Sequence, residues 1–327
     1  MKNTIDHLIN SRVLTTFNSL DTELTLNKKN NYLFDLSYLG LLNVVGDKAA
    51  DFLQGQLTCD LRLVSDIQMI EGAQCNLKGR ILSLLDIINW NGFKLILPRD
   101  LIESTQTSLT KTAQLSRVSI EQNGNLKVFG FYLQNPDDII PEATFLPNNL
   151  YAQARSSNYC YYHLGNGFYI FIIQTDIEHE FCNIFSERNQ LLGSLTWHTL
   201  RLYNHQIDIY PESRGLFLPH RLGLHQTQYI SFDKGCYKGQ EIIARTHYRA
   251  TLKHELRLYV IKSEQNLYSG QKLLKLEDET ELGELIDYSL LGNNHYLIAV
   301  SILKEGAQSA RFEGRNEVIS LESPDLL

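Results

Sequence analysis

Several features that mark other protein classes are missing from this 327-residue chain. No apolar run approaches the roughly 18 to 20 residues that span a bilayer. Residues 1–12 also contain no apolar stretch of signal-peptide length. These absences predict a cytoplasmic protein with no membrane segment.

Cysteines are few and scattered. The five cysteines are an odd number, and no two of them form a Cys-x-x-Cys pair. This pattern favours reduced thiols over a disulfide framework. It also gives no recognised set of metal ligands. The five are Cys59, Cys75, Cys160, Cys182 and Cys236.

Positive charge is in deficit, because 30 Lys and Arg face 37 Asp and Glu, for a formal net charge of -7. Non-specific attraction to nucleic acid or anionic lipid depends on clustered Lys and Arg. We therefore expect no direct nucleic-acid partner and no membrane partner. Any anion site must be local.

What is present is typical of a globular protein of two or three domains, with 43% hydrophobic and 20% charged residues. Two strand-like runs flank Asn91-Gly92, which suits a tight hairpin turn, and a helix follows to about Gln114. A second hairpin around residues 165–167 is also followed by a helix with one apolar face. This recurrence predicts an α+β architecture of two related lobes.

Two helix starts are predicted from capping residues. Asp47 can cap a helix whose apolar positions recur from Ala49 to about Cys59. Asp100 and Glu103 resemble a capping box for the helix that follows the first hairpin.

The final part of the chain has a different texture. After residue 250, alternating strands separated by polar turns predict a small β-barrel domain without a helix. We expect lobes at residues 1–118 and 119–250, which could interleave, and the barrel at 251–327. Residues 134–149, with three prolines, are expected to form a surface loop or linker.

One segment carries the strongest chemical signal. Residues 234–241 read Lys-Gly-Cys-Tyr-Lys-Gly-Gln-Glu and lead into a predicted helix. Cys236 would then lie at the helix N-terminus, where the dipole and the neighbouring Lys234 and Lys238 favour a thiolate. Gly235 and Gly239 leave the backbone open to a ligand. A buried, inert cysteine is the competing interpretation.

This eight-residue hallmark resembles that of the YgfZ family, whose fold is that of the glycine-cleavage T protein. Two weaker motifs lie in the expected order, at residues 54–60 and 75–80, and the similarity spans most of the chain. The resemblance implies two α+β lobes and a C-terminal β-barrel around a cavity for tetrahydrofolate. It also implies a monomeric accessory factor that supports iron-sulfur enzymes, such as radical tRNA-thiolating enzymes, through Cys236.

The resemblance further implies which residues bind the folate. Lys234, Gly235, Tyr237, Gly239 and Gln240 are expected to shape the cavity wall, with Glu241 and Arg245 orienting the helix or meeting the ligand. Relatives commonly carry a pterin-binding Glu where this chain has Tyr203, which cannot offer a charged bidentate acceptor. They also favour Pro-Gln and Asn-Leu where this chain has Pro219-His220 and Gly223-Leu224.

Two enzyme classes compete with this interpretation. A folate-dependent aminomethyltransferase of the same fold needs an acid soon after the strand entry at Gly79, and Asp86 comes late in an apolar strand. A cysteine hydrolase would need a base near Cys236. If His247 were on the same helix, it would lie roughly 16 Å away.

Two binding classes also compete. Four scattered histidines (His198, His205, His220 and His225) have no recognised ligand spacing, and one exposed cysteine does not hold a cluster. We therefore expect no resident metal. The basic stretch between residues 234 and 257 could serve RNA, but a solvated helix face or a site for a small anion is favoured.

Overall fold

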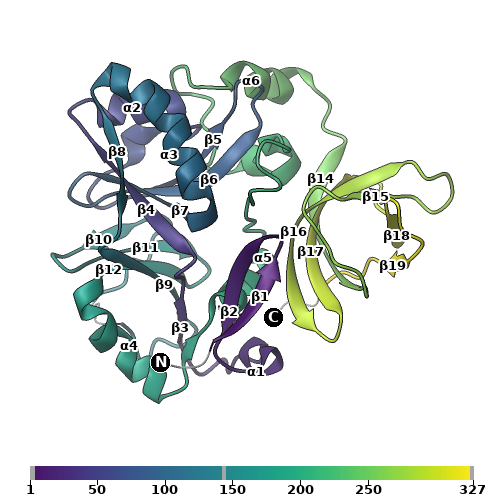
Figure 1. The fold of residues 1–327 in the computed structure, drawn as a ribbon, viewed down its shortest axis with the longest axis horizontal. Coiled ribbons are helices and arrows are strands. Elements are labelled where there is room, and N and C mark those ends of the chain that lie inside the picture. Colours follow the sequence, from purple (N-terminus) through teal and green to yellow (C-terminus); the bar gives the residue numbers. More distant parts are fainter. Residues whose placement is uncertain (1–3, 142–144, 325–327) are drawn as a thin grey trace.

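The computed structural model describes residues 4–141 and 145–324 and contains three larger β-sheets and a hairpin (Figure 1). The hairpin joins β1 (Ile5–Ile9) and β2 (Arg12–Thr16). Among the described residues, no helix is long and apolar enough to cross a membrane. The mixed α and β composition agrees with the predicted fold class.

The first sheet has five strands in the order β5-β6-β7-β4-β8. The turn at Asn91 and Gly92 joins β6 to β7, and both residues have positive φ, as a tight hairpin requires. Helices α2 and α3 lie beside this sheet in Figure 1. Its elements are β4 (Leu39–Val45), α2 (Ala49–Gln56), β5 (Ile70–Cys75), β6 (Ile81–Asn89), β7 (Phe93–Pro98), α3 (Arg99–Ala113) and β8 (Ser119–Asn123).

The second sheet has six strands in the order β10-β11-β12-β9-β3-β13. Strands β3 and β13 run parallel, and the other neighbouring strands of the three larger sheets run antiparallel. Its elements are β3 (Tyr32–Asp35), β9 (Leu126–Tyr132), β10 (Gln153–Arg155), β11 (Tyr159–Gly165), β12 (Phe168–Gln174), α4 (Glu178–Glu187), β13 (Leu191–Leu192) and α5 (Ser194–Tyr203).

The two sheets share a buried core. Leu41, Ile88 and Ile96 of the first sheet belong to one apolar cluster with Phe34 and Val128 of the second. The sheets also exchange chain segments, because β3 precedes the first sheet in sequence yet pairs in the second. Strand β8 begins at Ser119 and pairs in the first sheet. The proposed lobe boundaries stay a prediction.

The C-terminal sheet has six strands in the order β14-β17-β16-β15-β18-β19 and curls into a half-barrel (Figure 1). Val260 of β14 exchanges two backbone hydrogen bonds with Glu322, so the last described residues approach the first strand again. The β-barrel predicted near the C-terminus is thus a curled half-barrel sheet, and its bounds as a domain stay a prediction. Its strands are β14 (His254–Lys262), β15 (Lys272–Leu274), β16 (Glu281–Gly292), β17 (His295–Leu303), β18 (Ser309–Phe312) and β19 (Val318–Ser320).

Both predicted helix caps are wrong. Helix α2 begins after Lys48, and neither it nor α3 has a side-chain cap hydrogen bond. Asp100 instead accepts two hydrogen bonds from Arg12 at 2.8 and 3.0 Å. A buried arginine that needs a counter-ion uses this carboxylate more effectively than the helix end does.

Candidate functional site

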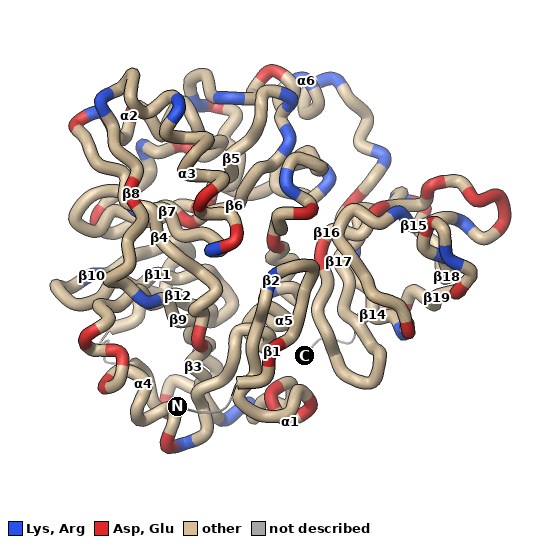
Figure 2. Tube along the Cα trace, viewed as in Figure 1, with Lys and Arg blue, Asp and Glu red and all other residues tan. Residues whose placement is uncertain are grey.

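The hallmark segment approaches helix α6 (Gln240–Arg249) through a turn, and Gly239 is the residue that caps the helix. Cys236 therefore lies in the turn that precedes the capping residue, whereas the sequence placed it at the helix N-terminus. Its side chain is exposed. Gly235 beside it has open space where a Cβ would stand. Figure 2 shows Lys and Arg along α6 and along the segment that leaves it.

The backbone of Gly239 packs against the Lys-Gly-Arg motif at residues 78–80, which lies in the turn between β5 and β6 of the first sheet. Its φ is +87°, and a Cβ there would lie 2.5 Å from the carbonyl oxygen of Asn76 and 3.1 Å from the Cα of Gly79. Gly79 also has positive φ, at +69°, and a Cβ on it would lie 3.1 Å from Ile243 of α6. Only glycine fits such a close approach without strain. These glycines serve packing.

Lys234 binds the motif at residues 54–60. Its side chain is 6% exposed, and its ammonium donates hydrogen bonds to the carbonyl oxygens of Gln54, Leu57 and Cys59 at 2.6, 2.8 and 2.6 Å. These carbonyls lie at and just beyond the C-terminus of α2, where a cation is favoured. Burial lowers the pKa of Lys234 to about 8. The charge of Lys234 therefore anchors the loop, whereas the sequence placed it beside the Cys236 thiol.

The remaining predicted site residues have distinct environments. Tyr237 is buried in the core of the first lobe, and its N–H donates to Oε1 of Gln240 at 3.4 Å. Glu241 and Arg245 are exposed on α6. Tyr203, the last residue of α5, is partly buried against the same core.

A cavity lies where the first sheet, the loop after α5, the η4 and η5 turns (Pro219–Leu222 and Leu224–Gln226) and the start of β14 meet. Its volume is about 670 Å³. Residues 234–241 and Tyr203 are not part of its lining. Residues 234–241 therefore do not form the cavity wall that was predicted for them.

A buried carboxylate lies on the sheet side of this cavity. Glu71 of β5 accepts hydrogen bonds from the hydroxyls of Tyr151 at 2.6 Å and Tyr229 at 3.2 Å, and all three residues line the cavity. Burial raises the pKa of Glu71, and the neighbouring Asp86 raises it further. Sequence reasoning missed Glu71, which is a lone acid in an apolar run.

Asp86 stands directly opposite Glu71 in the register of β5 and β6. It accepts a hydrogen bond from Tyr162 at 2.6 Å and lines a second, smaller cavity of about 50 Å³ together with Arg201. The guanidinium of Arg201 lies 4.0 Å from Glu71. Asp86 is therefore part of an interior polar cluster, although its strand reads as apolar.

A histidine cluster forms another part of the cavity wall. The rings of His220 and His225 are stacked with centroids 4.9 Å apart, and His247 of α6 lies 6.1 and 6.2 Å from them. His247 also stacks on Phe232 at 3.9 Å. Helix α6 thereby connects the hallmark to the cavity. Burial lowers the pKa of His220 to about 4, and its two histidine neighbours add to the effect.

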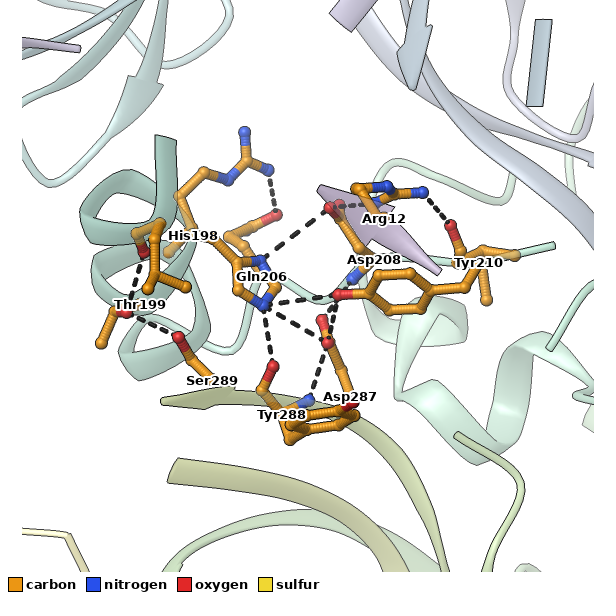
Figure 3. A network of polar contacts seen from close by, with 12 residues as sticks. Arg12, His198, Thr199, Gln206, Asp208, Tyr210, Asp287, Tyr288 and Ser289 are labelled. Atoms are coloured by element: carbon orange, nitrogen blue, oxygen red, sulfur yellow. Dashed lines mark hydrogen bonds and ion pairs between the residues drawn. The ribbon is translucent and has the colours of Figure 1, made fainter. Parts of the chain in front are cut away.

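A second polar network joins the hairpin, α5 and the half-barrel (Figure 3). His198, 3% exposed, lies 3.4 Å from Asp287 and 3.9 Å from Asp208. Tyr210 donates a 2.6 Å hydrogen bond to Asp287, and Arg12 donates one of 2.7 Å to Asp208. Such a network fixes the relative position of the parts that enclose the cavities.

All five cysteines are free thiols. Cys59, Cys75 and Cys160 are buried, Cys182 is intermediate and Cys236 is exposed. Within residues 4–141 and 145–324, no group of three or more His, Cys, Asp or Glu side chains has the arrangement of a metal site.

Known proteins resemble this chain in sequence and in fold. The tRNA-modifying protein YgfZ of Vibrio atlanticus is 27% identical over 237 residues, which are 72% of this chain and 71% of that protein. YgfZ of Klebsiella pneumoniae is 27% identical over 296 residues, covering 88% and 90%. No family model matches the chain.

Among solved structures, the glycine cleavage system aminomethyltransferase T from Bartonella henselae superposes with a TM-score of 0.68 at 14% identity. The match covers 98% of this chain and 94% of that one, so it establishes the fold. The resemblance predicted from the hallmark is confirmed. The chain is therefore similar in sequence to the tRNA-modifying YgfZ proteins and has the fold of the glycine-cleavage T protein.

Proposed function

We propose that this protein is a folate-binding accessory factor that supports iron-sulfur cluster assembly or repair, including in enzymes that modify tRNA. Cys236 is the group through which it acts. The observation that carries this proposal is the hallmark loop, which presents one exposed thiol on a rigid frame. Lys234 holds the loop against the motif at residues 54–60, and Gly239 holds it against the motif at residues 75–80. The thiol therefore has a defined position.

The central cavity suits a folate in size and chemistry. Its volume of about 670 Å³ is in the usual range of ligand pockets. Glu71 offers carboxylate oxygens to a ring edge rich in N–H groups, and the apolar side chains of Leu84 and Leu222 provide contact area for a planar ring. Bound tetrahydrofolate would supply a reduced pterin that carries one-carbon groups.

We propose that the hallmark residues predicted to contact folate act indirectly, by positioning helix α6. Lys234, Gly235, Tyr237, Gly239 and Gln240 would set the position of α6, whose His247 reaches the cavity histidines. The exposed side chains of α6 would meet the part of the ligand that leaves the cavity; these are Glu241 and Arg245. Tyr203 would act only by packing at the end of α5.

A calorimetric titration with 5-formyltetrahydrofolate tests folate binding. We expect one saturable site, and we expect Glu71→Gln to weaken binding by at least about tenfold, because a charged acceptor is lost from a buried site. Glu121→Gln on exposed β8 is the matched control and should bind as the wild type does. Thermal unfolding of both variants checks that they are folded. An absence of saturable binding to the wild type would refute this part of the proposal.

A second candidate is folate-dependent aminomethyl transfer, which the buried pair Glu71 and Asp86 favours. That reaction moves a methylene group from an aminomethyl thioether to tetrahydrofolate and releases ammonia and the free thiol. Incubation of the protein with an aminomethylated lipoyl carrier and tetrahydrofolate decides between them. Catalytic formation of methylenetetrahydrofolate would favour the transferase, and its absence the accessory factor.

A further inference from the structure

The stacked imidazoles of the cavity wall lack hydrogen-bond partners within the described chain. His220 is 5% exposed, and neither of its ring nitrogens has a partner. The Nδ1 atom of His225 is also buried without one. Buried polar groups are normally satisfied, so unpaired nitrogens that line a cavity indicate a ligand that pairs with them.

The charges around these imidazoles are mostly basic. Lys304, after β17, lines the same cavity, and its positive charge lowers the pKa of His225. His247 of α6 lowers the pKa of both His220 and His225. From β14, His254 and Glu255 line the cavity, but Glu255 pairs with Arg257 at 2.5 Å. Arg221 of η4 pairs with Glu284 of β16 at 3.3 Å. The described residues therefore place no unengaged carboxylate against His220 or His225.

We propose that His220, His225 and Lys304 form an anion-binding wall that receives a carboxylate of the ligand, and that the imidazoles take up a proton on binding. The inference rests on the proposed folate binding, because a folate carries a glutamate tail with two carboxylates. The pterin edge then pairs with Glu71 on β5, and the tail extends along the η4 and η5 turns. One ligand thus satisfies both polar parts of the cavity.

The sign of the pH dependence follows from the free state of the wall. Burial and the neighbouring imidazoles lower the pKa values of His220 and His225, so both rings are uncharged near neutral pH without ligand. A bound carboxylate favours the charged ring and raises its pKa in the complex. Binding at this wall therefore takes up protons and strengthens as the pH falls, by up to about tenfold per pH unit for one proton. Pairing of the pterin with Glu71 has the opposite sign, because it favours the ionised form of a carboxyl whose pKa burial raises to about 7.

Calorimetry between about pH 6 and about pH 8 measures this linkage. Titration with 5-formyltetrahydrofolate in two buffers of different ionisation enthalpy gives the number of protons taken up. A second probe, 6-methyltetrahydropterin, lacks the tail and its carboxylates. We expect more proton uptake with the folate than with the pterin, because pairing with Glu71 alone releases protons from a buried carboxyl whose pKa is raised to about 7. The double variant His220→Gln, His225→Gln should lose the gain in affinity at the acidic end, about tenfold, while the control His179→Gln on α4 keeps it.

The outcomes separate this inference from the proposed function. A proton count on folate binding that is the same in the double variant as in the wild type would overturn the anion wall and leave folate binding intact. Equal proton uptake with the tail-free pterin would also overturn it, because the carboxylate would then play no part. Failure of the wild type to bind either probe at any pH would overturn the proposed function and this inference with it. Unfolding curves of the double variant confirm that it is folded before binding is compared.

Discussion

Gly79 and Gly239 lie backbone against backbone, so that the Lys-Gly-Arg motif of the first sheet and the hallmark before α6 form one packed unit. Neither position tolerates a side chain, because both have positive φ and a close backbone neighbour. The two motifs recognisable from sequence are thus parts of a single structural joint. Its geometry positions the loop that carries Cys236.

Gly239→Ala should destabilise the protein by about 2 to 4 kcal/mol, because the new Cβ meets the Asn76 carbonyl in a left-handed backbone conformation. Urea unfolding measures the change in the free energy of unfolding. Gly235→Ala is the matched control, since open space surrounds that position, and it should change stability by less than about 0.5 kcal/mol. Equal effects of both substitutions would contradict the proposed joint.

Lys234→Met should cost about 3 kcal/mol, because three backbone carbonyls lose their charged donor. The exposed Lys78 of the neighbouring motif provides the comparison, and Lys78→Met should be nearly neutral. Chemical denaturation of both variants checks this. A Lys234 variant as stable as the wild type would show that the ammonium does not anchor the loop.

His198 should make stability depend on pH. Burial opposes its charge, but Asp287 and Asp208 outweigh burial and raise its pKa (Figure 3). The stabilisation from this pairing is fully present below the unfolded value of about 6.5, and it is lost as the pH rises through the raised folded-state pKa. Unfolding free energies measured across that range should fall for the wild type and for His179→Gln. The fall should be shallower in His198→Gln, where the raised pKa of Glu71 still contributes, and a slope as steep as that of the wild type would refute the assignment.

Cys236 should be the first thiol to react with iodoacetamide in the folded protein. Burial raises the pKa values of the thiols of Cys59, Cys75, Cys160 and Cys182 to about 12 and shields their sulfur atoms. Mass mapping after brief alkylation identifies the labelled residue, and a denatured sample that labels at all five positions is the control. Preferential labelling of a buried cysteine would contradict the exposed loop.

The sequence predicts local elements well where periodicity and turn residues act within a few positions. The hairpin at Asn91 and Gly92 and helix α4, with Phe181 and Phe185 buried, follow from such short-range signals. The cap expected at Asp100 fails because Arg12, distant in sequence, takes that carboxylate. Short-range patterns carry no information about such a partner.

The candidate site likewise has one part that the sequence predicts and one part that it does not. The hallmark identifies the Cys236 loop, in which Gly239 packs on Gly79 and Lys234 binds the carbonyl oxygens after α2. The cavity was not predictable, because Glu71 and Asp86 meet only through the register of β5 and β6. The histidine wall likewise needs α6 folded against η4 and η5, which brings His247 to His220. The position of Glu71 opposite Asp86 and the histidine wall both depend on contacts between residues that are distant in sequence.

The central claim is that Cys236 acts chemically while its loop is held by other residues. A deletion strain complemented with wild-type protein or with Cys236→Ala, at equal protein level, tests it through the activity of a cluster-dependent tRNA-thiolating enzyme. The substitution removes one exposed sulfur atom, so stability should change by less than about 0.5 kcal/mol. We predict that Cys236→Ala is folded, binds folate and fails to restore thiolation. Full restoration by the alanine variant would contradict the account.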